Sequence, residues 1–355
     1  MAHSNSSLNT FASCMAKYEH SYILHTPPCK PPSPHLAFGV MAHEVLYKAG
    51  KLRDEINDKV SDGEYMTIIP SEVLYPELKS EFNIQNWYRY FVNVVKQVAK
   101  YENDCVNELR EKGNVQIERE VKLQLTVDQL RNLGITGINQ PIVGIIDLLI
   151  IGDGYATILD YKFSSNRKTQ DDFDQNSQLP LYALFVHYLY DIPLHNIKVG
   201  YIDIPKQDFG KPTVLSNGTI SRAKTQNVSQ EQYEEYVNAI HGRWYVKTES
   251  GLSQVEFDPC VKQICEPDEY YNCRPGGYYY DCWCQMALNK AAYLSVQYID
   301  IDTYINVTQD LFNAARMIDM MIANKLPFLR KYDAYSCKSC EYVNTCKKWL
   351  GVNNE

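Results

Sequence analysis

The sequence predicts a mixed α/β fold, in which helices flank a central mixed sheet. Two apolar runs within residues 141–164 are separated only by Asp153-Gly154 and indicate a pair of strands. Residues 115–127 alternate apolar and polar side chains, as a strand with one buried face does. Residues 84–112 carry apolar side chains at helical spacing. These three segments define a sheet and at least one long helix that packs on it.

The dipeptide Asp153-Gly154 sets the register of the predicted hairpin. Both central residues of a two-residue type I′ turn need a positive φ, which Asp-Gly pairs tolerate well. Counting outward from this turn, Asp147 faces Asp160 across the two strands. Residues two apart on a strand share a face, so Lys162 lies on the same side as Asp160. The sequence therefore predicts two carboxylates and an ammonium converging on one face of a buried hairpin.

This predicted trio needs a chemical explanation. Two carboxylates about 5 Å apart across a strand pair cannot easily both stay ionised in a partly dry site. A divalent cation between them removes the conflict, and oxygen ligands suit Mg²⁺ or Mn²⁺. A lysine beside the ion could stabilise charge on a phosphate or position a water. Alternatively, Asp147 and Asp160 are strand-end residues and Lys162 is a solvated charge. A polar trio within an apolar run is costly unless it is used, which favours the metal site.

The composition is that of an ordinary globular protein. The chain has 355 residues, of which 45% are hydrophobic and 22% are charged. Apolar runs are too short for a transmembrane helix, and the N-terminus lacks the pattern of a secretory signal. We therefore expect an intracellular protein, cytoplasmic or nucleoid-associated, without membrane contact. The net charge of −8 argues mildly against nonspecific coating of nucleic acid, although it permits a local basic groove.

The chain is predicted to form one composite domain with four parts. They are a helical N-terminal part, a catalytic core, a Tyr- and Cys-rich insertion, and a C-terminal helix with a cysteine cluster. Their predicted ranges are 1–112, 113–205, 206–300 and 301–355.

The N-terminal part contains two predicted helices before the long one. The first spans residues 10–23 and carries Cys14, and prolines between residues 27 and 34 mark a loop that holds Cys29. The second spans residues 38–60 and carries His43 near its start. A lone histidine there is either a ligand or a structural, solvated side chain.

The core adds further polar candidates around the hairpin. Glu118 or Glu120 on the strand at 115–127 could reach the metal site, and the sequence does not choose between them. A helix is predicted over 177–190, and Pro180 fits only its first turn, which places Gln178 at its start. Gln178 and Tyr182 then share one face. Both can hydrogen-bond, and the tyrosine could stack on a base; otherwise they are a cap and a core residue. Residues 197–204 form a further strand.

The segment 206–300 is irregular, and its chemistry is ambiguous. None of its cysteines has C-x2-C spacing, so a second metal site is only weakly indicated, and its tyrosines are expected to pack on the domain. These cysteines are Cys260, Cys265, Cys273, Cys282 and Cys284.

The C-terminal part holds the strongest metal motif. After a predicted helix at 305–325, Cys337, Cys340 and Cys346 have the spacing C-x2-C-x5-C. Closely spaced cysteines in an intracellular protein indicate a metal centre. Three thiolates leave a tetrahedral site or an iron–sulfur cubane one ligand short, and Cys14 is the candidate for the fourth.

These motifs together resemble those of the RecB-like branch of the PD-(D/E)XK nucleases. The motifs that carry the resemblance are His43, Asp147, Asp160-Tyr161-Lys162 and Gln178-Leu179-Pro180-Leu181-Tyr182. The four cysteines resemble those of its iron–sulfur members, which include the CRISPR-adaptation exonucleases and exonuclease V proteins. The resemblance extends over residues 14–346, although the insertion has no matching part.

The resemblance implies a restriction-endonuclease-like core and a role for each motif residue. His43, Asp147 and Asp160, with the carbonyl of Tyr161, would bind Mg²⁺ or Mn²⁺. Lys162 would orient the attacking water and stabilise charge on the phosphate, while Gln178 and Tyr182 would support the site and the DNA strand. A [4Fe–4S] cluster, with zinc as the alternative, would be held by the four cysteines Cys14, Cys337, Cys340 and Cys346.

Three functions are compatible with the sequence. The first is a metal-dependent DNA exonuclease that acts on single strands or ends in recombination, repair or replication. The chain has no Walker A motif, so a helicase or recombination partner would be a separate chain. The second is a silent nuclease fold that binds DNA ends or assembles a complex. The third, a zinc-stabilised interaction protein, leaves the hairpin trio unexplained.

Overall fold

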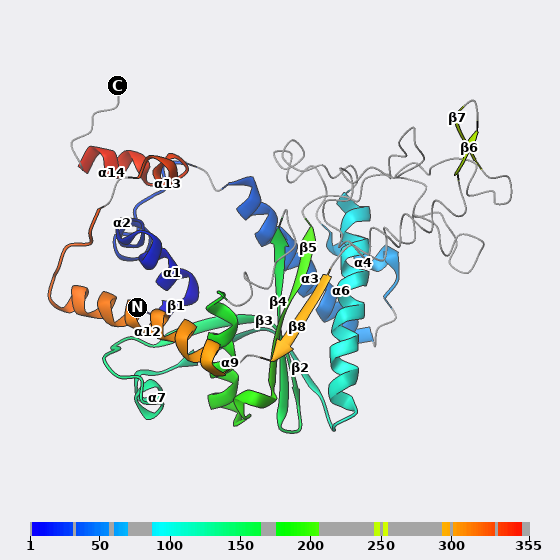
Figure 1. Cartoon of the computed structure of the whole chain (residues 1–355), viewed down its shortest axis with the longest axis horizontal. Coiled ribbons are helices and arrows are strands. Elements are labelled where there is room, and N and C mark those ends of the chain that lie inside the picture. The colour runs from blue at the N-terminus through cyan, green and yellow to red at the C-terminus, as the bar shows by residue number, and fades with distance from the viewer. Residues whose placement is uncertain are drawn as a thin grey trace.

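A mixed six-stranded sheet forms the centre of the computed structural model (Figure 1). The structure describes residues 2–30, 33–56, 60–69, 87–164, 175–205, 245–248, 251–254, 293–298, 301–330 and 333–349. The sheet has the order β1-β3-β4-β5-β8, and β2 also pairs with β3. Its strands are β1 (His3–Ser4), β2 (Gln116–Leu125), β3 (Ile142–Gly152), β4 (Tyr155–Ser164), β5 (Ile197–Pro205) and β8 (Tyr293–Tyr298).

The sheet combines antiparallel and parallel pairs. β3 pairs antiparallel with β2 and β4, and β5 pairs antiparallel with β8. β4 and β5 are parallel because the helix between them returns the chain to the same edge. The short β1 pairs parallel with the start of β3.

Helices cover both faces of this sheet (Figure 1). One face packs against α3 (Pro34–Ile56), α4 (Asp62–Ile68) and α6 (Trp87–Arg110) in a single buried cluster. The other packs against α1 (Asn5–Ser13), α9 (Gln178–Tyr190) and α12 (Ile301–Ala323) in a second cluster. A mixed sheet with helices on both faces confirms the predicted fold class.

Shorter elements complete the described chain. They are α2 (Met15–Tyr18), a π-helical turn (Glu19–Ile23), α7 (Val127–Asn132), a 3-10 turn (Leu194–Asn196), α13 (Ala334–Lys338), α14 (Val343–Trp349), and the separate hairpin of β6 (Tyr245–Thr248) and β7 (Gly251–Gln254).

The N-terminal and C-terminal segments of the described chain lie side by side (Figure 1). His3 of β1 is buried, and its Nε2 lies 3.0 Å from Oδ1 of Asp319 in α12. Farther along, the amide of Cys29 donates to the carbonyl of Glu341, next to α14. These contacts bring the N-terminal helices against the C-terminal cysteine segment.

The predicted hairpin register is confirmed. Gly152 pairs with Tyr155, and Leu149 pairs with Ile158 across the Asp153-Gly154 turn. Gly154 has a φ of 76°, as a tight turn requires. The predicted helix at 38–60 instead begins at Pro34, because proline is well suited to the first turn of a helix.

The segment predicted as an insertion contributes a strand that the sequence analysis missed. β8 lies in it and extends the central sheet beside β5. The five cysteines from Cys260 to Cys284 and most of the tyrosines of this segment lie outside the described residues. In the described part of the chain, no helix is both long and apolar enough to cross a membrane.

Gly144 in β3 allows α9 to pack closely on the sheet. A Cβ atom at this position would lie 2.6 Å from the ring of Tyr182 and 2.7 Å from that of Phe185. Gly144→Ala should therefore lower the free energy of unfolding by about 1–3 kcal/mol through overpacking. Urea denaturation measures this loss. The control is Gly39→Ala in α3, where a Cβ meets nothing within 4 Å and the helix should gain slightly. Equal losses in both variants would contradict this account of the packing.

Candidate active site

The hairpin separates at the two aspartates. The pairing of β3 with β4 ends at Leu148 and Leu159, which are the immediate neighbours of Asp147 and Asp160. Beyond this point, the start of β3 pairs with β1 and β2. The two carboxylates therefore lie just beyond the point where the pairing of the two strands ends.

Asp160 is a buried carboxylate next to an ammonium. Its side chain is 4% exposed, and Lys162 Nζ lies 2.5 Å from its Oδ2. Among the described residues, Oδ2 has no partner in hydrogen-bond geometry, so the contact with Lys162 is an ion pair. Burial raises the pKa of Asp160, Lys162 lowers it and Asp147 raises it, with the result that the pKa lies at about 6. Lys162 therefore offsets only part of the cost of ionising this buried carboxylate.

Asp147 connects the two strands and the helix α3. Its Oδ2 accepts a hydrogen bond from the amide of Tyr161 at 2.8 Å. Its Oδ1 lies 3.4 Å from Nδ1 of His43. Burial lowers the pKa of His43, but its contact with Asp147 and the charge of Asp160 outweigh burial, so the pKa is raised. The structure thus brings His43 to the same carboxylate pair.

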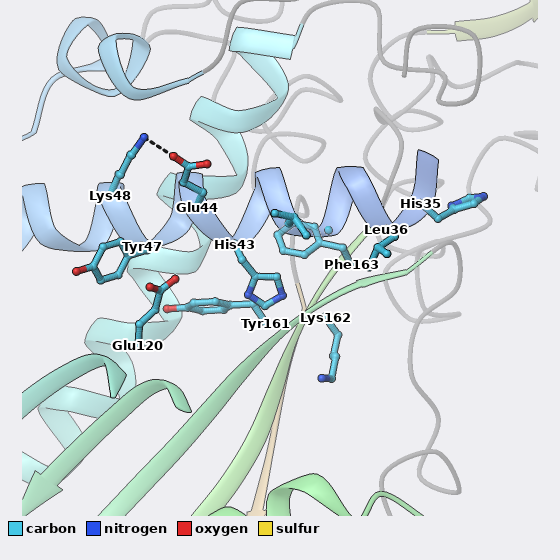
Figure 2. A pocket seen from close by; sticks show the side chains of 12 residues that line it. His35, Leu36, His43, Glu44, Tyr47, Lys48, Glu120, Tyr161, Lys162 and Phe163 are labelled. Atoms are coloured by element: carbon cyan, nitrogen blue, oxygen red, sulfur yellow. Dashed lines mark hydrogen bonds and ion pairs between the residues drawn. The ribbon is translucent and has the colours of Figure 1, made fainter. Parts of the chain in front are cut away.

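Aromatic rings hold the imidazole of His43 in place. Figure 2 shows His43 extending from α3 toward the end of β4. Its ring centroid lies 5.5 Å from that of Phe163, with the rings edge to face, and 6.2 Å from that of Tyr161. This packing limits the rotation of the imidazole and keeps Nδ1 directed at Asp147.

The start of α9 holds the ammonium of Lys162. Lys162 Nζ donates to Oε1 of Gln178 at 2.9 Å, and Nε2 of Gln178 donates to the hydroxyl of Tyr182 at 2.8 Å. The side chain of Asn176 accepts the amides of Gln178 and Leu179, which fixes the first turn. Gln178 and Tyr182 therefore lie one turn apart on α9. Gln178 binds Lys162 directly, and Tyr182 binds Gln178.

A buried ionic network, which the sequence analysis missed, anchors Tyr161. The hydroxyl of Tyr161 donates to Oε1 of Glu102 in α6 at 2.5 Å. Glu102 is also bound by Arg53 of α3 at 2.7 Å and by Arg119 of β2 at 2.9 Å. Two arginines neutralise the buried carboxylate, which is the condition for burying a charge. Tyr161 is therefore held at both ends, since its hydroxyl binds Glu102 and its amide binds Asp147.

The structure distinguishes the two glutamates of β2. The side chain of Glu118 accepts a hydrogen bond from Tyr190 at 2.9 Å. Glu120 has a left-handed φ of 47° and lies opposite Asp147, where the pairing of β2 with β3 is interrupted. Burial and then Asp147 raise the pKa of Glu120. Glu120 is therefore the β2 carboxylate beside the site.

The backbone of Glu120 also changes which side chains face each layer. Ile117 packs with the cluster of α3 and α6, whereas Leu123 packs with that of α9. Regular alternation would place both on one face, since they are six residues apart. The alternation is therefore reversed between them, in the stretch of β2 that contains the left-handed Glu120, and the apolar pattern alone did not reveal this.

The oxygen and nitrogen atoms of these side chains are of the types that bind Mg²⁺ or Mn²⁺. Among the described residues, no three His, Cys, Asp or Glu side chains are already gathered around one point as a metal site. However, the carboxylates of Asp147 and Asp160 and the imidazole of His43 lie together, and Asp160 Oδ2 is buried without a hydrogen bond. A cation there would offset the burial and repulsion that raise the pKa of Asp160.

A cavity of about 850 Å³ lies between the N-terminal and C-terminal segments of the chain. Its lining includes Cys14, Cys337 and Cys340. Cys14 interrupts the predicted helix at 10–23, since it ends α1 and its sulfur caps α2 by accepting the amide of Lys17 at 3.4 Å. The sulfur of Cys340 accepts the amide of Tyr342 at 3.4 Å.

Cys346 in α14, the fourth predicted ligand, is not among the residues that line this cavity. Burial raises the pKa of its thiol first, and the charges of Cys340 and Cys14 raise it further, although Arg330 lowers it. Cys14, Cys337 and Cys340 thus line one cavity formed by both ends of the chain, and among the described residues no three cysteines are already arranged as a metal site. Two other described cysteines stand apart: Cys29 is exposed and donates to the carbonyl of Glu341, and Cys105 is buried in α6.

One known protein family matches almost the whole chain. A family model described as PD-(D/E)XK nuclease superfamily matches residues 2–347. A search of curated proteins found no match.

The raised pKa of Asp160 predicts a specific dependence of stability on pH. Its pKa is 3.8 ordinarily and about 6 in the fold, so the folded protein binds the proton more tightly. Stability is then lost as the pH rises from about 4 to 6. In a chelating buffer, Asp160→Asn should stabilise the protein by about 1–3 kcal/mol at pH 7.5, since one pKa unit equals about 1.4 kcal/mol. The gain should fall to about a third of this value at pH 4.5.

Thermal denaturation at the two pH values measures this difference. Added Mg²⁺ should raise the melting temperature of the wild-type protein more than that of the variant. If the variant were equally destabilised at both pH values, the ionisation of Asp160 would not lower the stability of the folded protein.

Proposed function

Because the chain belongs to the PD-(D/E)XK nuclease superfamily, we propose that it is a metal-dependent deoxyribonuclease of the RecB-like, iron–sulfur branch. We further propose that it is an exonuclease, acting on single strands or DNA ends in recombination, repair or replication. The observation that carries the proposal is the convergence of Asp147, Asp160 and Lys162 where the hairpin divides.

Four groups would hold Mg²⁺ or Mn²⁺. They are the side chains of His43, Asp147 and Asp160 and the carbonyl of Tyr161. When bound, such an ion lowers the pKa of a water and stabilises negative charge on a phosphate. The buried network around Glu102 supports this arrangement, because it fixes the backbone of Tyr161 between the two aspartates.

Lys162 is suited to the phosphate that is cut. Hydrolysis forms a bond from a water oxygen to phosphorus, breaks one phosphorus–oxygen ester bond and places a proton on the leaving oxygen. The ammonium of Lys162 carries protons on a compact charge that can hydrogen-bond the attacking water or a phosphate oxygen. Asp160 and Gln178 hold this ammonium in position, and Tyr182 holds Gln178.

The cysteine cavity is proposed to hold a [4Fe–4S] cluster, with zinc as the alternative. Its ligands would be Cys14, Cys337, Cys340 and Cys346. Backbone amides already donate to two of the sulfurs, as they do to cluster-bound thiolates. The cluster would join α1 and α2 to α13 and α14, and so link the N-terminal and C-terminal segments. The partners of the enzyme would be DNA and a separate helicase or recombination protein.

The nuclease activity is tested with end-labelled single- and double-stranded DNA in the presence of Mg²⁺ or Mn²⁺. Wild-type protein should digest DNA, and Lys162→Ala should be at least about 100-fold slower, the effect expected for losing one such electrostatic contact. Lys122→Ala, at an exposed position of β2, is the matched control and should digest normally. A Lys162→Ala variant with wild-type activity would overturn the site assignment. Wild-type protein that binds DNA without cutting it would favour the silent DNA-end-binding subunit.

The cluster is tested by metal analysis of protein purified without oxygen. We expect about four iron atoms per chain and a brown colour, both strongly reduced in Cys337→Ser. Cys29→Ser should keep its iron, because Cys29 is exposed and outside the cavity lining. Stoichiometric zinc without iron would instead support a zinc site on the same cysteines.

A further inference from the structure

We propose that the pocket between α3 and the end of β4 is a subsite for one unpaired nucleobase of the DNA strand, beside the phosphate that is cut. This inference rests on the proposed nuclease function and adds the part of the substrate that the enzyme recognises. The pocket has a volume of about 760 Å³, and its lining includes His43, Tyr161 and Lys162. It therefore opens directly onto the candidate active site.

One wall of the pocket is apolar and exposed. Leu36 and Val40 are 59% and 64% exposed, and both line the pocket from one side of α3. They lie one turn apart, and Tyr47 continues the same stripe beyond His43 (Figure 2). Phe163 contributes from β4. Large apolar side chains exposed around a cavity indicate a binding surface, and this one ends at the catalytic residues.

The side chains that line the pocket carry no excess of positive charge that would bind a phosphate group there. Lys48 and Lys162 are balanced by Glu44 and Glu120. Lys48 Nζ lies 2.6 Å from Glu44, and Lys162 is paired with Asp160. Figure 2 shows the Lys162 side chain extending away from α3, whereas His43 and Phe163 lie near the helix. An uncharged, flat ring with polar edges fits such a surface, and a nucleobase is that kind of group.

Gly39 leaves the floor of the pocket open. It lies on α3 one turn before His43 and lines the pocket, and a Cβ there would meet nothing within 4 Å. The first atom of a larger side chain at this position would therefore enter open space. The same position provides a way to fill the pocket.

The subsite predicts a preference for unpaired DNA. A base in a duplex is stacked and paired, and it must be displaced before it can enter a pocket beside its own backbone. A single strand or a frayed end presents the base without that cost. The wall of α3, rather than the metal site, would then distinguish single strands from duplexes.

The test combines abasic substrates with a filled pocket. Single-stranded oligonucleotides carry one abasic residue at each position in turn, near the labelled end. For wild-type protein, KM should rise about 5- to 100-fold at one position only, the range expected for losing one stacked base. Gly39→Leu should raise KM similarly on intact DNA and show no further penalty for the abasic residue. Lys51→Leu, at an exposed position of α3 outside the pocket lining, is the control and should keep most of the activity.

Two outcomes would overturn the subsite. One is a uniform response of the wild-type protein to all abasic positions. The other is a Gly39→Leu penalty that adds to the abasic penalty, because independent effects are additive.

A binding measurement separates this inference from the proposed nuclease function. The probe is single-stranded DNA with one 2-aminopurine, whose fluorescence reports contact of the base with the pocket. If no DNA is cut, a position-specific fluorescence change in the wild-type protein that is lost in Gly39→Leu would support the subsite and refute the nuclease. Cleavage without any such change would refute the subsite and leave the nuclease standing.

Discussion

The buried contact between Asp160 and Lys162, beside Asp147, is the constraint on which the site depends. A carboxylate pair in the interior is unfavourable unless positive charge is supplied. Lys162 supplies part of it at 2.5 Å, and the pKa of Asp160 remains raised to about 6. The ionised carboxylates are thus only partly neutralised, at the point where β3 and β4 separate. A bound cation would complete the neutralisation. A scaffold built only for stability would fill this position with apolar side chains.

The surrounding layers keep this unfavourable arrangement in place from both faces of the sheet. On one face, the ionic network of Glu102 with two arginines anchors Tyr161, whose amide binds Asp147. On the other, the first turn of α9 fixes Gln178, which binds Lys162. Each of these contacts orients one residue of the proposed chemistry, and α3 also contributes His43. The proposed cysteine cluster lies apart from both, at the joined ends of the chain.

The sequence revealed those features that depend on local rules. The Asp153-Gly154 turn fixed the hairpin register, and Pro180 located Gln178 at the start of α9. Features that depend on distant residues were not predictable. Glu102 and its arginines come from three separate elements, and each looks like an ordinary surface charge in its own helix or strand. The left-handed backbone of Glu120 has no local signal, since neither glycine nor asparagine occupies the position.

The most direct test of the central claim is anomalous diffraction from crystals soaked with Mn²⁺. The account predicts a single strong peak in contact with the carboxylates of Asp147 and Asp160 and near the imidazole of His43. It also predicts that this peak is absent from crystals of Asp160→Asn. A peak elsewhere, or an unchanged peak in the variant, would contradict the claim that the divided hairpin of β3 and β4 is the metal site.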